Sequence, residues 1–212
     1  MSMKIALDLF CKAGGASDGL AAAGYTIVGV DIEDQDNYPY QFIKADAISF
    51  LEAMITIGSS VDLIWASPPC QGFTAYRRNG KVKDYPNYIP KLRSLLSSIN
   101  CNWVIENVEG APLENAVTLC GSMFGLDVKR HRVFESNFVI APMSCNHGLW
   151  KPRFPPASNR SNLRKTVEVG VYRIPIEIQK RAMGISRKVT LKELSNAIPP
   201  VYSKYIGQCA QQ

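Results

Sequence analysis

Short apolar runs alternate with segments of helical spacing along the first half of the chain. The apolar runs predict five strands, at 4–9, 26–30, 42–44, 61–65 and 103–105. Apolar positions three and four residues apart predict helices between them, at 18–23, 48–57 and 88–99. Strands that alternate with helices are typical of an α/β fold. The pattern therefore predicts a mostly parallel central sheet with helices packed on it.

The second half of the chain has a weaker pattern. It predicts a short helix over 115–124 and a strand that includes residues 133–134. From residue 141 to about 178 the hydrophobic periodicity is lost and Pro, Asn, Ser, Arg and Lys predominate, which predicts an irregular segment. Short helices are expected afterwards, at 179–183, 190–195 and 201–209. We therefore divide the chain into segments 1–140, 141–181 and 182–212.

Charge is concentrated in one region of the chain. The net charge is +6, but residues 151–190 contain ten Lys or Arg and only two acids, Glu168 and Glu177, so the remaining residues sum to −2. A solvated basic face is the simpler interpretation of any such run. A loop-rich segment that carries more than the whole net charge favours a polyanionic partner.

Length and composition exclude several classes of protein. A chain of 212 residues with 46% hydrophobic positions can bury the core of one domain. No apolar run reaches 18 residues, so we expect no transmembrane helix, and the first residues do not resemble a signal peptide. Six cysteines without a CxxC pair favour a reduced, cytoplasmic protein.

Polar residues follow four of the predicted strands, and we expect them to meet at one edge of the sheet. Gly14-Gly15 follows the first strand, and Asp31 ends the second. Cys70 and Glu106 follow the fourth and fifth strands. In open α/β sheets, ligands bind outside the carboxyl ends of the strands. A strand, a glycine turn, a helix and a strand ending in a carboxylate is the order of a nucleotide-type cofactor site, although a glycine pair alone can be a simple tight turn.

The residue types at this edge suggest covalent chemistry. Two prolines precede Cys70 and fix its backbone, which suits a positioned nucleophile, but a buried structural cysteine would look the same. Burial at a strand end would raise the pKa of Glu106, as a proton donor requires. A surface acid that caps a turn is the alternative. In a strand, Arg130 and Arg132 would point to one side as anion binders, with His131 opposite and without a catalytic role.

Two further groups of residues carry weaker signals. Residues 76–83 combine four cations with an aromatic residue around an Asn-Gly turn, which suits phosphate contacts but also describes a solvated loop. Cys145 and His147 have metal-ligand chemistry, yet two ligands without a second pair are weak evidence, and we predict no metal there.

Taken together and in order, these motifs resemble the C5-cytosine DNA methyltransferase family over nearly the whole chain. The resemblance is carried by Asp8-Leu9-Phe10 with the glycine pair, Pro69-Cys70-Gln71, Glu106-Asn107-Val108, Arg130-x-Arg132 and Asn196-Ala197-Ile198-Pro199-Pro200. The compact arrangement is similar to bacteriophage and prophage members. The family implies a Rossmann-like class I methyltransferase fold, with S-adenosylmethionine as cofactor, no metal, and 141–181 as a small target-recognition segment between the catalytic and C-terminal segments.

The resemblance assigns residues to three roles. The catalytic group consists of Cys70 as the nucleophile, Glu106 at N3 of cytosine, Arg132 at the O2 carbonyl and Arg130 ordering the loop. The cofactor group consists of Phe10, Ala13, Gly14, Gly15, Asp31, Ile32, Asp46, Ala47, Pro69 and Asn196. The substrate group begins with Gln71, Thr74 and Asn107, beside the cysteine and glutamate motifs. The composition of the basic segments, and not the resemblance, adds Arg77, Arg78, Asn159, Arg160 and Arg164. Arg and Asn carry donors for phosphates and base edges, although exposed polar residues of any loop would look the same. We expect nearby cations to lower the pKa of the Cys70 thiol and help form the thiolate.

Three departures from the family pattern bear on this assignment. Lys12 stands where a glycine is usual, and a cation there could touch the carboxylate of the cofactor. Ser195 replaces a glycine before the closing asparagine. The segment between the arginine and closing motifs is short, which argues against specific recognition of a long DNA sequence. The expected partner is double-stranded DNA bound by a monomer in the cytoplasm of a bacterial host. RNA cytosine methylation and a catalytically silent DNA-binding decoy are the alternatives.

Overall fold

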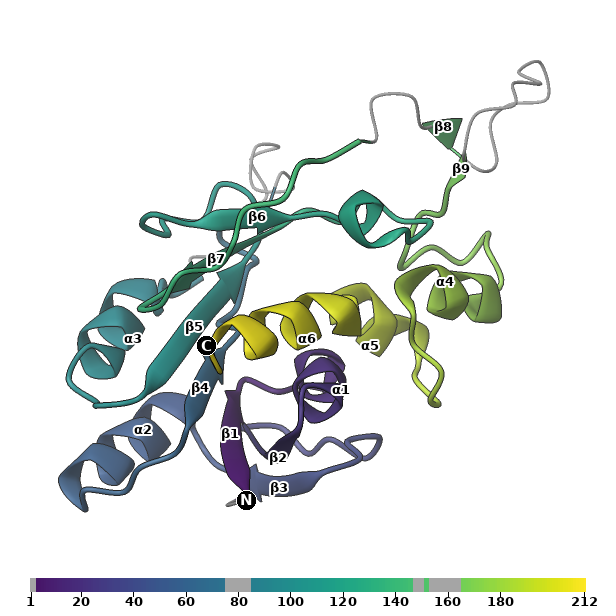
Figure 1. Ribbon diagram of the computed structural model, residues 1–212. Helices are drawn as coiled ribbons and strands as arrows, with labels where there is room; N and C mark the ends of the chain where they lie inside the picture. Colours follow the sequence, from purple (N-terminus) through teal and green to yellow (C-terminus); the bar gives the residue numbers. More distant parts are fainter. Residues whose placement is uncertain (1–2, 75–84, 147–150, 153–164) are drawn as a thin grey trace.

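The computed structural model describes residues 3–74, 85–146, 151–152 and 165–212 (Figure 1). Its elements in chain order are β1 (Lys4–Leu9), α1 (Gly15–Ala22), β2 (Tyr25–Asp31), β3 (Gln41–Lys44), α2 (Ala47–Thr56), β4 (Leu63–Ala66), α3 (Ile89–Leu96), β5 (Asn102–Asn107), β6 (Val117–Leu119), the 3₁₀ helix η2 (Gly121–Phe124), β7 (Arg132–Ser136), β8 (Lys151–Pro152), β9 (Lys165–Thr166), α4 (Ile176–Met183), α5 (Leu191–Asn196) and α6 (Pro200–Cys209). The predicted α/β class is confirmed.

A seven-stranded sheet in the order β3-β2-β1-β4-β5-β7-β6 forms the centre of the molecule. The first five strands in this order are parallel, whereas β7 runs antiparallel to both β5 and β6. The parallel strands end in register: Leu9 pairs with both Val30 and Ala66, and Ala66 pairs with Ile105. Their carboxyl ends therefore lie along one edge of the sheet.

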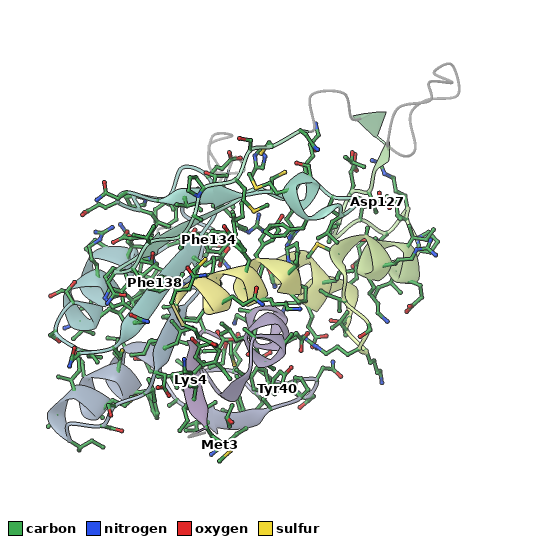
Figure 2. All side chains as sticks on the ribbon, in the orientation of Figure 1. Met3, Lys4, Tyr40, Asp127, Phe134 and Phe138 are labelled. Atoms are coloured by element: carbon green, nitrogen blue, oxygen red, sulfur yellow. The ribbon has the colours of Figure 1, made fainter. Side chains whose placement is uncertain are left out.

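Helices cover both faces of the sheet. α1 and α6 pack together on one face, and α2 and α3 lie on the other (Figure 1). Phe134, labelled in Figure 2, packs on the α6 face. Its ring centroid lies 5.7 Å from that of Trp65 and 6.2 Å from that of Tyr202. Among the five parallel strands, β1, β4 and β5 bury consecutive apolar residues, as expected of a sheet covered on both sides.

A third apolar cluster lies outside the sheet. It joins Val128 to apolar residues between 167 and 194, including Met183 of α4 and Leu194 of α5. The predicted helices at 179–183 and 190–195 are confirmed as segments of α4 and α5. Thr190 caps α5 by accepting a hydrogen bond from the Glu193 amide. No helix within the described ranges is long and apolar enough to cross a membrane.

Two expectations for the region before and around β7 are wrong. The segment 115–124 contains β6 and η2 instead of one helix. The Gly121 amide donates to the Lys129 carbonyl at 2.8 Å, and a Cβ at Gly121 would lie 2.1 Å from the Val128 carbonyl oxygen, so this turn closes tightly against the returning chain. Arg130 has φ 36° and precedes β7, so strand alternation does not orient the two arginines.

Candidate active site

Loops from four strand ends and the α5–α6 turn enclose one pocket. Its lining comes from the loop after β1, the Ser67–Gln71 loop after β4, Glu106 of β5, Arg132 of β7 and residues 193–198. The parallel register described above explains why loops far apart in the sequence meet here. The pocket therefore combines the predicted nucleophile and acid with the predicted cofactor loop.

The glycine loop forms the N-terminal end of α1. Gly14 has φ 85°, a left-handed conformation that favours glycine, and it is the residue that precedes the helix. A Cβ at Gly15 would lie 3.0 Å from the Cβ of Ala197, so glycine here allows the α5–α6 turn to pack closely. Arg187 fastens the loop because its guanidinium binds the Ala13 carbonyl and the Asp18 carboxylate, the latter at 2.7 Å.

Asp31 ends β2 as a buried carboxylate. Its Oδ2 accepts from the Lys12 amide at 3.1 Å and its Oδ1 accepts from the Glu33 amide at 3.1 Å. The Lys12 ammonium lies 3.5 Å from Asp31 Oδ1 and 3.3 Å from Glu33 Oε2. Lys12 thus lies beside these two acids, and its contact with a cofactor carboxylate stays a prediction.

Asp8 of β1 supplies a buried carboxylate oxygen to the pocket. Its Oδ2 accepts from the Ser17 hydroxyl at 2.5 Å, while Oδ1 is buried without a hydrogen-bond partner among the described residues. Burial, and to a lesser extent the charges of Asp31 and Glu106, raise the pKa of Asp8 to about 7. A buried acceptor without a partner calls for a donor, and an ammonium group such as that of an amino-acid cofactor supplies one. The residues present therefore fit S-adenosylmethionine.

Cys70 follows β4 in a loop that its neighbours hold in place. The buried amide of Asn107 donates to the Pro68 carbonyl at 3.0 Å, and Phe73 donates its amide to the Cys70 carbonyl at 2.9 Å. Burial and the charge of Glu106 raise the pKa of the Cys70 thiol, although Arg132 opposes this shift. The expected lowering of the thiol pKa is thus wrong, because burial outweighs the cations.

Asn107, which we expected to contact substrate, is only 1% exposed. With its amide on Pro68, it positions the cysteine loop instead.

Glu106 is a nearly buried acid at the end of β5. Its Oε1 lies 3.2 Å from Arg132 Nε, and the Ser67 hydroxyl also hydrogen-bonds to it. Ser67 in turn accepts from the Trp65 indole at 2.9 Å. Desolvation by burial is the largest influence and raises the pKa of Glu106 despite the neighbouring arginines, as predicted. Burial therefore makes this carboxyl group easier to protonate than an exposed glutamate, which is the direction a proton donor requires.

Arg130 binds the closing motif and has no direct bond to the acid. Its Nε donates to the Ala197 carbonyl at 2.8 Å and its Nη2 to the Ser195 carbonyl at 2.5 Å. The Arg130 carbonyl accepts from the Tyr202 hydroxyl of α6 at 3.0 Å. These contacts join residues 130–132, here called the arginine loop, to the α5–α6 turn. They agree with the loop-ordering role that we predicted.

The remaining predicted site residues fall into three groups. Members that line the pocket are Phe10, Ala13, Gly15, Pro69, Gln71 and Asn196. Other predicted residues of the cofactor and cysteine loops do not line the pocket: Gly14, Asp31, Ile32, Asp46, Ala47 and Thr74. Ile32 is 63% exposed beside Asp31. Asp46 caps α2, because its side chain accepts a hydrogen bond from the Ser49 amide at 2.9 Å. The predictions for Arg77, Arg78, Asn159, Arg160, Arg164 and His147 lie outside the described residues.

Three of the five cations whose side chains are described in the basic segment 151–190 have acidic partners. Among its described side chains, Arg187 bonds Asp18, Arg173 bonds Glu168 and Lys180 bonds Glu177. Arg187 counted only as one more surface cation in the sequence, because nothing there signals that it turns inward to the glycine loop. Ser67 was also missed as a polar pocket residue, although it lies two residues after a predicted strand end, and Asp8 was recognised only as part of the cofactor-loop motif.

This Rossmann-like sheet and its pocket define the fold of S-adenosylmethionine-dependent methyltransferases. A prophage protein of E. coli, solved as a candidate DNA modification methyltransferase, shares it with a TM-score of 0.65 at 14% identity, over 99% of both chains. S. pombe Dnmt2 methyltransferase matches with a TM-score of 0.60 at 15% identity, also over 99% of both chains. Identities this low establish the fold alone.

Sequence comparison gives the family. Residues 4–118, just over half of the chain, match the model of the C-5 cytosine-specific DNA methylases. The chain belongs to this family. It is similar to the Type II methyltransferase M.HgiGI of Herpetosiphon aurantiacus, with 33% identity over 50% of this chain and 92% of that one. It is also similar to M.AgeI of Thalassovita gelatinovora, with 28% identity over 49% of this chain, a match that spans only 28% of the relative. The match to M.HgiDI likewise spans only 41% of that relative.

Proposed function

We propose that this chain is a DNA cytosine-C5 methyltransferase that acts on a cytosine flipped out of duplex DNA. The observation that carries the proposal is the placement of Cys70 and Glu106 at adjacent strand ends, in one pocket with the glycine loop. Family membership and the DNA-modifying names of the Type II relatives support DNA as the substrate. S-adenosylmethionine, when bound, supplies an electrophilic methyl group.

The cofactor would lie along the loops after β1, β2 and β3. Asp31 would accept from the ribose hydroxyls and Asp8 Oδ1 from the ammonium group, since both are buried acceptors at this edge. Phe10 and Ile32 would supply apolar contacts, with Asp46 beside the adenine. Asn196 and Arg130 would close the pocket from the α5–α6 turn.

Cys70 would act as the nucleophile on C6 of cytosine. Its thiolate forms the S–C6 bond, the C5–C6 electron pair shifts into the ring, and N3 takes a proton from Glu106. The resulting enamine carbon C5 accepts the methyl group. Water then removes the C5 proton, the S–C6 bond breaks with release of the Cys70 thiolate, and N3 returns its proton to Glu106.

The raised pKa values suggest how the reactive protonation state forms. A charged Glu106 opposes ionisation of Cys70, so a thiolate is favoured when Glu106 is protonated. That pairing, a thiolate beside a neutral acid, is the one that the reaction needs. Arg132, 3.2 Å from Glu106, would hold the O2 carbonyl while its charge favours the thiolate.

Base flipping costs a few kcal/mol and needs protein contacts to the strand. Gln71 and Thr74 lie on the cysteine loop, where they would meet the backbone of the flipped nucleotide. We also propose that the small segment 141–181 faces the DNA target, between the catalytic segment 1–140 and the C-terminal segment 182–212. We also propose that the protein acts as a monomer, because flipping and methylating one base needs only one active site.

Parallel methyl-transfer assays on duplex DNA and on RNA, followed by base-resolution mapping, test this proposal. We expect 5-methylcytosine in duplex DNA, in a short sequence context, and none with Cys70→Ser. Label that appears only in RNA would reassign the substrate. Tight binding to duplex DNA without any methyl transfer would favour the silent decoy instead.

A further inference from the structure

A second group of chemically reactive side chains lies outside the pocket. Cys120 follows β6, His131 precedes β7, and Cys145 belongs to the segment that runs back over β6 after β7 (Figure 1). The ligand atoms of these three residues all lie within 4.8 Å of one another, and both cysteines are free thiols. The proposed methyl transfer uses none of them.

The distances within this group match those of a shared metal ion. Cys145 Sγ lies 3.5 Å from His131 Nε2. Zinc binds thiolate at about 2.3 Å and imidazole at about 2.05 Å, so two such ligands at a tetrahedral angle are about 3.6 Å apart. The pair is therefore already spaced as tetrahedral coordination requires.

Outer contacts orient His131 and Cys120. The Cys120 thiol donates to the Lys129 carbonyl at 3.0 Å and would release that proton on binding zinc. Glu109 Oε1 lies 3.1 Å from His131 Nδ1, so the carboxylate accepts the Nδ1 proton and leaves the Nε2 lone pair toward the sulfurs. The buried Cys120 Sγ accepts from the Ser122 hydroxyl at 3.3 Å, and the Asn146 amide donates to the same hydroxyl at 3.4 Å. A carboxylate–histidine pair with hydrogen-bonded sulfur is the usual surrounding of a zinc ligand set.

We propose that Cys120, His131 and Cys145 bind one zinc ion, with water in the fourth position. Two thiolates and one imidazole suit zinc, whereas magnesium and calcium prefer oxygen ligands. Cys145 is exposed, which gives the ion a path of entry. The sequence could not indicate this site, because Cys120 and His131 lie 25 and 14 residues before Cys145 and have no recognisable metal-binding spacing.

The consequence is structural. His131 stands between Arg130 and Arg132, so the ion would fasten the chain around Cys145 to the arginine loop. That loop carries the arginine that contacts Glu106. Zinc would thus stabilise the position of the arginine loop, and no step of the methyl transfer passes through it.

Zinc content and affinity of the purified full chain test the proposal independently of methyl transfer. Wild type and the control Cys101→Ser, whose cysteine lies outside the group, should each bind one equivalent of zinc. Cys145→Ser changes an exposed ligand with little risk to folding. It should lower the affinity for zinc at least about tenfold, measured in competition with a chelator. Glu109→Gln keeps all three ligands and should lower the affinity for zinc by about 10- to 100-fold.

Cobalt substitution identifies the ligands. The cobalt-loaded wild type and Cys101→Ser should show thiolate-to-cobalt absorption that Cys145→Ser reduces. Equal zinc binding by wild type and Cys145→Ser, or a cobalt spectrum that Cys145→Ser leaves unchanged, would overturn the proposal. A metal-free protein whose Cys120 and Cys145 are joined as a disulfide would also overturn it and define a redox pair.

Discussion

The buried carboxylate of Asp8 makes the stability of this protein depend on pH in a predictable direction. Burial raises its pKa to about 7, so the native state binds the proton more tightly than the unfolded chain does. The contribution of Asp8 to the free energy of unfolding is therefore largest below pH 4 and falls as the pH rises to about 7. A shift from an ordinary value near 3.8, at about 1.4 kcal/mol per pKa unit, amounts to about 4 kcal/mol.

Asp8→Asn removes the titration and retains the shape of the side chain. Urea-induced unfolding of wild type and variant, from pH 4 to pH 8, isolates the effect because other groups cancel in the difference. The new amide will add an offset that does not depend on pH. We expect the difference in the free energy of unfolding to move in favour of the variant by up to about 4 kcal/mol between pH 4 and pH 7.

Ser17→Ala is the companion variant, since the Ser17 hydroxyl stabilises the charged form of Asp8. Its loss should raise the pKa of Asp8 further and extend the fall in stability to higher pH. A difference between wild type and Asp8→Asn that stays constant from pH 4 to pH 8 would refute the buried, proton-binding carboxylate. It would also remove the main support for Asp8 as the partner of the cofactor ammonium group.

Three further substitutions separate the roles within the pocket. Glu106→Gln should slow methyl transfer by about 10²–10⁴-fold but speed iodoacetamide alkylation of Cys70, since loss of the negative charge lowers the thiol pKa; slower alkylation would contradict the coupling. Asn107→Ala leaves the Pro68 carbonyl without its donor and should cost about 1–3 kcal/mol in urea unfolding, whereas an unchanged midpoint would refute the positioning role. Arg130→Lys loses the two hydrogen bonds to the α5–α6 turn and should weaken binding of S-adenosylmethionine more than binding of DNA in calorimetric titrations. A larger loss of DNA binding would instead place Arg130 at the DNA.

Most of the sheet and the chemical core of the pocket could be predicted from the sequence, for a physical reason. Strands buried on both faces need continuous apolar runs, and these runs are visible without any structure. Because parallel strands end at one edge, Asp31, Cys70 and Glu106 had to lie along the same edge once the strands were recognised. The direction of the Glu106 pKa shift followed from the same burial.

Features that depend on long-range contacts could not be predicted. Arg130 has a positive φ and its guanidinium reaches carbonyls 65 and 67 residues away, and no local sequence pattern indicates either feature. The short β6 forms because β7 returns beside it, which overrode the helical spacing of 115–124. The thiol pKa of Cys70 rises because desolvation outweighs charges that the sequence merely counts.

The central claim is that Cys70 forms a covalent bond with the target base. Duplex DNA with 5-fluorocytosine at the mapped target position tests it, because fluorine at C5 leaves no proton to remove and prevents release of the cysteine. With S-adenosylmethionine, the wild type should form a denaturant-stable protein–DNA complex whose attached peptide maps to Cys70. Cys70→Ser should form none. Attachment at Cys11, the other cysteine that lines the pocket, or methylation of ordinary DNA without any trapped complex, would contradict the account.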